Sequence, residues 1–175
     1  MKIYSRTIHA NGICQHYLEA GDGPAVLLLH GFPETSYALR FQIPELATKY
    51  RVIAPDLREY GETDKPSSGY DKRTMTTHLR ELMRALNLPK IALVGHDRGA
   101  RVATRFAKDH SEAVDRLIVM DNVPTRTSVE NLTPQRRRGI GFSYFTWFRS
   151  FRKDSSQVVK TSGCVTISPI GALIP

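Results

Sequence analysis

Short apolar runs recur along the first 121 residues and predict the strands of a sheet. Four of them are rich in leucine and β-branched residues: AVLLLH (25–30), RVIAPD (51–56), IALVGHD (91–97) and DRLIVMD (115–121). Such runs are typical of parallel strands that are buried on both faces. Two earlier segments, YSRTIHANG (4–12) and ICQHYLEAG (13–21), alternate in polarity and predict a hairpin of strands.

Helical stretches separate these predicted strands. They are SYALRFQIPELATKY (36–50), DKRTMTTHLRELMRALNL (71–88) and GARVATRFAKDH (99–110). The second has one apolar stripe, made of Met75, Leu79, Leu82, Met83 and Leu86. Strands that alternate with helices indicate the α/β class, with a doubly wound and mostly parallel sheet. A site is then expected at the carboxyl ends of the strands.

Composition and charge limit the kind of protein. At 175 residues and 41% hydrophobic content, the chain is long enough for one domain with a core. Most of the net charge of +8 comes from the C-terminal part of the sequence. Residues 1–121 hold 17 Lys and Arg and 15 Asp and Glu, whereas residues 122–175 hold 8 Lys and Arg and 2 Asp and Glu. A charge cluster outside a core is usually solvated, so we expect no nucleic-acid partner. The chain has no apolar run of membrane-spanning length and no signal-like start, which favours the cytoplasm.

The stretch LVGHDRGAR (93–101) carries the most specific chemical signal. It places Asp97 between a strand and a helix, with Gly95 and Gly99 two residues to either side. This is the pattern of a nucleophile elbow with Asp in the usual place of Ser. A carboxylate is already anionic at neutral pH and can displace a leaving group from a saturated carbon. The alternative is a tight turn with an Asp that caps the helix, which the strand and helix on either side make less favoured.

The stretch LLLHGFPE (27–34) predicts an oxyanion hole. It follows an earlier buried strand, and the backbone N–H groups of Phe32 and Arg98 can hold a developing negative oxygen. For the side chain of His30 we favour a structural role, with hydrogen bonds inside the loop. His96 should point away from the site.

Several of these motifs together carry a resemblance to a known family. HGFPETSYALR, RVIAPDLREYGETDKPSSGYDKRTM and LVGHDRGARVATRFAKDH resemble the α/β-hydrolase superfamily, in the branch of epoxide hydrolases and dehalogenases, over about residues 12–127. GHDRGAR is most similar to the haloacetate (fluoroacetate) dehalogenases. The resemblance implies a hydrolase of small molecules, without metal or other cofactor. Glu59 stands where relatives usually carry glycine.

Arg98 and Arg101 suggest what kind of substrate is bound. They lie three residues apart in the first turn of a predicted helix, and paired guanidinium groups beside a helix N-terminus suit a carboxylate. In haloacetate dehalogenases the matching arginines hold the substrate carboxylate, which implies a short 2-halo acid here. The alternative is that Arg98 pairs with Asp97 and that Arg101 is a solvated helix residue.

Asp121 ends the strand after the nucleophile's helix. If the two strands are neighbours, both carboxylates emerge at the same edge of the sheet. In relatives an acid at this place orients the catalytic histidine, although an Asx turn in DNVP is an alternative. All six histidines precede Asp121, so the base is missing. We therefore interpret the chain as truncated or frame-shifted.

The predicted division of the chain follows from this absence. Residues 1–124 form the N-terminal part of the hydrolase core, incomplete at its C-terminal side. Residues 125–175 begin the cap and continue as a divergent, basic, poorly ordered tail without helices or strands. YFTWF faintly resembles the cap's first aromatic helix, which makes Trp147 a candidate halide donor, although packing or disorder is favoured. The strand at 115–121 would then be an exposed edge, through which we expect self-association.

Three functions remain open. The leading one is a haloacetate dehalogenase-like hydrolase that works through an aspartyl ester. The second is an epoxide hydrolase, favoured by HGFPE and VIAPDLR. The third is a remnant that binds a carboxylate without turning it over.

Overall fold

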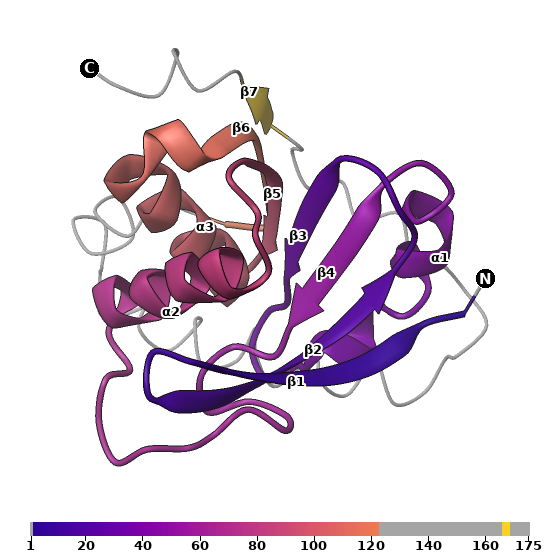
Figure 1. Ribbon diagram of the computed structural model, residues 1–175. Helices are drawn as coiled ribbons and strands as arrows, with labels where there is room; N and C mark the ends of the chain where they lie inside the picture. Colours follow the sequence, from indigo (N-terminus) through magenta and orange to yellow (C-terminus); the bar gives the residue numbers. More distant parts are fainter. Residues whose placement is uncertain (1, 123–165, 169–175) are drawn as a thin grey trace, which may run out of the picture. The chain divides into compact units, whose positions relative to one another are not determined.

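A twisted sheet forms the centre of the described part of the protein. The computed structural model describes residues 2–122 and 166–168 (Figure 1). In chain order the strands are β1 (Tyr4–Ala10), β2 (Ile13–Ala20), β3 (Ala25–Leu29), β4 (Arg51–Pro55), β5 (Ile91–His96), β6 (Val114–Met120) and β7 (Thr166–Ser168). Their order across the sheet is β1-β2-β4-β3-β5-β6-β7.

The pairing of the strands agrees with the sequence pattern. β3, β4, β5 and β6 run parallel to one another, as their continuous apolar runs predict. β1 and β2 form the predicted hairpin, and β2 pairs antiparallel with β4. The α/β class and the mostly parallel sheet are therefore confirmed.

Two of the three predicted helices form nearly as expected. They are α2 (Lys72–Ala85) and α3 (Arg98–Asp109). Asp71 caps α2 by accepting a hydrogen bond from the Thr74 N–H at 3.0 Å. A short 3₁₀ turn, η2 (Ser111–Ala113), follows α3.

The single helix predicted over residues 36–50 is wrong. The segment divides into a 3₁₀ turn, η1 (Ser36–Leu39), and the short helix α1 (Gln42–Leu46). Pro44 has no N–H and cannot bond to a carbonyl four residues earlier, so it fits only the first turn of a helix. A new helix therefore begins at Gln42 instead of continuing from residue 36.

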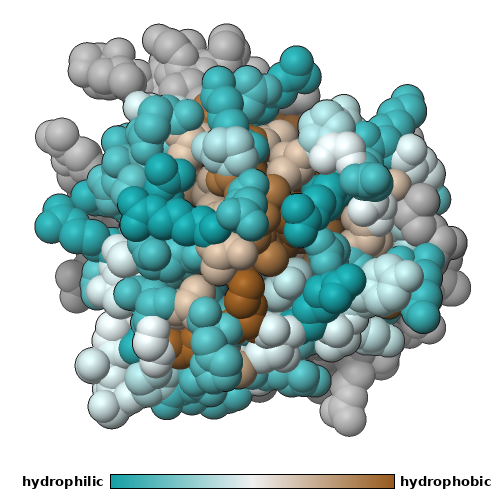
Figure 2. All heavy atoms as spheres, viewed as in Figure 1, coloured by the Kyte–Doolittle hydropathy of each residue, from teal (hydrophilic) through white to brown (hydrophobic). Residues whose placement is uncertain are grey.

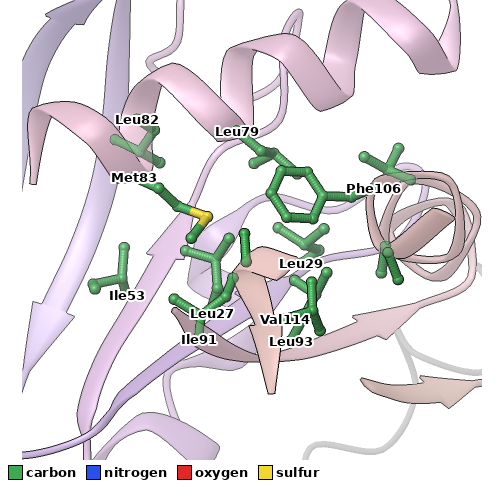
Figure 3. Close-up of a cluster of buried hydrophobic side chains, with 14 of the residues drawn as sticks. Leu27, Leu29, Ile53, Leu79, Leu82, Met83, Ile91, Leu93, Phe106 and Val114 are labelled. Carbon is green, nitrogen blue, oxygen red and sulfur yellow. The ribbon is translucent and has the colours of Figure 1, made fainter. Parts of the chain in front are cut away.

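The main hydrophobic core lies between the sheet and the pair α2 and α3. Leu79, Leu82 and Met83 from α2 face Phe106 of α3 and a group of strand residues (Figure 3). Four of the five stripe residues are buried, and Leu86 packs partly against the same cluster. A smaller core, which includes Ile43 and Val52, packs α1 on the sheet.

The prediction that the tail contains no strand is wrong at three residues. β7 pairs antiparallel with β6, with Thr166 opposite Val119 and Ser168 opposite Leu117. β6 is thus not a wholly open edge, because β7 covers three of its seven residues. The boundary proposed at residue 124 lies outside the described residues and stays a prediction.

The described surface is mostly polar on the face of Figure 2, where apolar residues show between hydrophilic ones. This distribution is ordinary for a folded domain. Among the helices of residues 2–122, none has the length and apolar character that crossing a membrane requires.

Candidate active site

Asp97 occupies a sharp turn between β5 and α3. Its backbone has φ of 46° and ψ of −109°, a conformation that residues other than glycine rarely adopt. A Cβ at Gly95 would lie 2.6 Å from the Gly99 carbonyl oxygen, and one at Gly99 would lie 2.5 Å from the Leu29 carbonyl oxygen. Both positions therefore need glycine, because the backbone segments around the turn approach so closely. Strain held at one residue is common at functional sites.

The side chain of Asp97 turns toward the loop after β3. Its Oδ2 accepts a hydrogen bond from the Phe32 N–H at 2.9 Å, and it makes no capping hydrogen bond with α3. The carboxylate therefore lies beside one predicted oxyanion donor. The other, Arg98, is the first residue of α3, and the first N–H groups of a helix have no partner within it.

His30 holds two loops together below this turn. Its Nδ1–H donates to the Gly31 carbonyl at 2.9 Å, and its Nε2 accepts from the Leu57 N–H at 3.0 Å. Burial lowers the pKa of the ring, which favours its neutral form, and the two hydrogen bonds fix its tautomer. The structural interpretation of His30 is confirmed.

His96 does not point away from the site as predicted. Its Nδ1 lies 3.4 Å from the Glu34 carboxylate, and its Nε2 lies 3.8 Å from that of Asp121. The contact with Glu34 raises the pKa of His96 against the opposing effect of burial. A Cβ at Gly31 would lie 2.9 Å from His96 Nδ1, so the ring packs directly on the loop after β3. The ring reaches this place because β5 lies between β3, which leads to Glu34, and β6, which leads to Asp121.

Glu34 is a site residue that the sequence reasoning missed. Its Oε2 accepts from the Gly31 N–H at 2.9 Å, which fixes the shape of the loop that carries Phe32. Burial would raise the pKa of Glu34, but the hydrogen bonds from His96 and Gly31 lower it overall. The available signal was an acidic residue three positions after a glycine, at the carboxyl end of a buried strand.

Asp121 lies next to Asp97 along the sheet edge, as the strand order predicts. β5 and β6 are neighbours, and the Asp97 N–H donates to the Met120 carbonyl at 3.1 Å. The Asp121 side chain is 78% exposed and faces His96 at 3.8 Å. The histidine that the family resemblance implies as its partner does not follow Asp121 in this sequence.

The two arginines at the start of α3 are partly buried and make no salt bridge within residues 2–122. The Arg98 guanidinium lies 5.6 Å from the ring centre of Tyr60. The Nε of Arg101 is buried and has no hydrogen-bond partner among the residues that the structure describes. Lys72 lies close enough that burial and the charges of Arg101 and Arg98 lower its pKa. The sequence also allowed an alternative, in which Arg98 pairs with Asp97 and Arg101 is solvated. The partial burial of both arginines and the position of Arg98 over Tyr60 do not match that alternative.

Tyr60 is a second residue that was not anticipated. Its ring packs edge-on against His30 at 5.1 Å and against Phe32 at 6.4 Å, and Arg98 lies over it. Burial raises the pKa of its phenol. The Tyr60 ring therefore lies between the loop after β3 and the first residue of α3. Trp147, the candidate halide donor, lies outside the described residues.

Comparisons with known proteins agree with this geometry. Residues 24–163 match the family described as alpha/beta hydrolase fold. A soluble epoxide hydrolase of Corynebacterium sp. (strain C12) is 47% identical over 114 residues, which are 65% of this chain and 40% of that protein. A fluoroacetate dehalogenase of Burkholderia sp. is 37% identical over 148 residues, which are 82% of this chain and 47% of that protein.

Solved structures give a similar picture. The structure of epoxide hydrolase CorEH without ligand has a TM-score of 0.65 and 46% identity, and the match covers 66% of this chain and 41% of that one. Epoxide hydrolase VrEH1 from Vigna radiata has a TM-score of 0.64 and 40% identity over 66% of this chain and 39% of that one. The chain thus spans less than half the length of each of these four relatives.

Proposed function

Because the chain belongs to the α/β hydrolase fold family, we propose that Asp97 is a nucleophile that displaces halide from a short 2-halo acid. The carboxylate attacks the carbon that bears the halogen, the halide leaves with the bonding electrons, and an ester forms on Asp97. The N–H groups of Phe32 and Arg98 then stabilise the oxyanion when water attacks that ester.

The observation that carries this proposal is the buried Nε of Arg101, which has no hydrogen-bond partner in the described part of the chain. A buried donor without a partner costs free energy, and a ligand carboxylate would remove that cost. Arg101 lies four residues after the nucleophile, on the helix whose N-terminus Asp97 precedes. Arg98 and the nearby Lys72 add positive charge, which favours an anionic substrate.

The second step requires a base that activates water. All six histidines precede Asp121, and His96 is held by Glu34 at 3.4 Å. We therefore expect the ester on Asp97 to persist in this chain. Alkylation of Asp97 should therefore release at most one halide per chain.

Bromoacetate and peptide mass spectrometry test the proposal. Folded chain should gain a carboxymethyl group on the peptide that contains Asp97, and Asp97→Asn should abolish it. Asp115→Asn, at an exposed acid near the start of β6, is the matched control and should leave the adduct unchanged. Alkylation confined to Cys14, Cys164 or the histidines would contradict a nucleophilic role for Asp97.

An epoxide hydrolase is the second candidate, favoured by the names of most of the relatives that match. The same carboxylate would open an epoxide ring, but a neutral epoxide gains nothing from a carboxylate-binding arginine. Arg101→Leu separates the two substrates. Under the halo-acid proposal it slows alkylation by bromoacetate and spares alkylation by styrene oxide. If the unchanged chain and Arg101→Leu react with bromoacetate at equal rates, and both react rapidly with styrene oxide, the epoxide hydrolase function is favoured.

A further inference from the structure

A serine, a histidine and an aspartate form a row of hydrogen-bonded side chains on β1, on β2 and just after β4, and none of these strands leads to Asp97. Ser5 is on β1, His16 is on β2, and Asp56 directly follows β4. The Ser5 Oγ lies 2.9 Å from His16 Nε2, and His16 Nδ1 lies 2.7 Å from Asp56 Oδ2. These are the contacts between nucleophile and base, and between base and orienting acid, that define a hydroxyl nucleophile by geometry.

The strand register produces this alignment. β1 and β2 pair Thr7 with His16, so Ser5, two residues earlier, shares that face of the hairpin and is the diagonal neighbour of His16. On the other side of β2, the Asp56 N–H donates to the His16 carbonyl at 2.9 Å, which places the two residues side by side. All three side chains are therefore positioned by backbone pairing.

The hydrogen bonds of Asp56 decide which nitrogen of His16 faces the hydroxyl. Burial would raise the pKa of Asp56, but the N–H groups of Ser36 at 2.6 Å and Glu62 at 3.0 Å bond to its carboxylate and lower it. An ionised carboxylate only accepts hydrogen bonds, so Nδ1 of His16 carries the hydrogen. In the neutral ring, Nε2 then presents its lone pair to the Ser5 hydroxyl.

Burial decreases along the row from acid to hydroxyl. The side chains of Asp56 and His16 are 2% and 7% exposed, and Ser5 is exposed on β1. Glu62 is a further charged group near the ring, with its carboxylate 3.9 Å from Nε2 and its side chain 76% exposed. Reagents in solution can thus reach the hydroxyl while the base and the acid stay fixed.

We propose that Ser5, with His16 as its base and Asp56 as the orienting acid, is a second nucleophilic site that takes the acyl group of small activated aryl esters. The Ser5 oxygen attacks the ester carbonyl while its proton moves to His16 Nε2. The tetrahedral intermediate expels the aryl oxygen, which takes that proton from His16 and leaves as a phenol. The products are an acyl ester on Ser5 and the free phenol, and His16 is neutral again.

We expect one acyl group per chain before hydrolysis begins. β1 is the terminal strand of the sheet, so its alternate N–H groups point away from β2 and can stabilise the intermediate. His16 Nε2 is free again once the phenol has left, and the Glu62 carboxylate lies 3.9 Å from it, so water can hydrolyse the acyl ester in a later step. An acid quench soon after mixing should therefore trap the acyl group on Ser5.

p-Nitrophenyl acetate with an Asp97→Asn chain tests the site without interference from Asp97. One acetyl group should appear on Ser5, located by peptide mass spectrometry, and hydroxylamine should remove it because it is an ester. Acetyl groups on Lys2 or the N-terminal amine are amides and should resist hydroxylamine. Ser5→Ala should abolish the labile adduct, and Ser5→Cys should retain it.

His16→Gln should slow the reaction of Ser5 at least about tenfold, since general-base catalysis typically contributes more than that. Thr7→Ala, on the same face of β1, is the matched control and should leave the rate unchanged. A Ser5 that reacts no faster than the exposed Ser67 and Ser68 of the same digest would overturn the proposal. An unchanged rate in a His16→Gln chain with an unaltered circular dichroism spectrum would overturn it as well.

Discussion

Glu59 adopts a backbone conformation that favours glycine. Its φ is 85°, and its side chain is exposed. Left-handed backbone at a residue with a Cβ costs on the order of 1 kcal/mol or more. Glu59→Gly should therefore raise the free energy of unfolding by about 1 kcal/mol, with part of the gain offset by a more flexible unfolded chain. Urea denaturation measures the change.

Glu62 offers the matched control in the same loop. It is also exposed, but its φ is not positive, and its N–H donates to Asp56. Glu62→Gly should leave stability unchanged or lower it. A loss of stability in both variants would show that the strain at Glu59 is not relieved by glycine.

Arg101 should contribute specifically to the binding of carboxylates. Arg101→Leu should weaken the binding of glycolate by about 1.5–3 kcal/mol, the range for hydrogen bonds to charged groups. Arg101→Lys should also weaken it, because an ammonium group lacks the planar fork of a guanidinium. Titration calorimetry with glycolate, and with neutral glycolamide for comparison, measures both effects.

Arg105 is the control for Arg101 on the same helix. It pairs with Asp109 at 2.7 Å, so Arg105→Leu should leave glycolate binding unchanged. An equal loss for glycolate and glycolamide in Arg101→Leu would refute the assignment of Arg101 to a carboxylate.

The sequence predicts the positions of residues whose surroundings are set by neighbours along the chain. Asp97 could be predicted because Gly95 and Gly99 stand two residues to either side, where the turn requires them. The contact of His96 with Glu34 could not be predicted, because these two residues are 62 positions apart and meet only when β3 and β5 pair. The row of Ser5, His16 and Asp56 depends in the same way on strand register.

At the scale of elements, His78 ties α2 to the hairpin and to the loop after β4. Its Nε2 contacts the Arg58 guanidinium at 2.5 Å, and its Nδ1 contacts the Asn11 amide at 3.1 Å. Burial first, and then the charge of Arg58, lower the pKa of His78 from 6.5. The folded state thus binds this proton less readily than the unfolded state does. Its contribution to stability is present above about pH 6.5 and is lost as the pH falls from there toward the lowered pKa.

The melting temperature should therefore decrease as the pH is lowered from about 7 to about 5. His30, with a pKa also lowered by burial, acts in the same direction, and His96, with a raised pKa, acts against it. His78→Gln isolates the contribution of His78 to this pH dependence. The melting temperature of this variant should fall less steeply over this range than that of the unchanged protein. Parallel curves for the two proteins would contradict a role for His78 in the acid sensitivity.

The elements were predictable where periodicity was long and uninterrupted. α2 contains four of the five apolar stripe residues, has the fifth, Leu86, as its C-cap, and forms within a few residues of the expected bounds. The segment 36–50 failed because Pro44 interrupts the backbone hydrogen bonds that one continuous helix needs. β7 has three residues and no pattern of its own, so only its pairing with β6 reveals it.

For the whole molecule, the edge formed by β6 and β7 is the expected route to self-association. β7 covers only Leu117–Val119 of β6, and unpaired backbone groups on an edge strand are a template for pairing with another chain. The full chain should show a molecular mass that rises with concentration in light scattering. A chain that ends at residue 163 lacks β7 and should associate at lower concentration, because more of β6 is then open. If both chains stay monomeric over the same concentrations, the edge does not mediate association. If the shorter chain associates no more readily than the full chain, β7 does not protect β6.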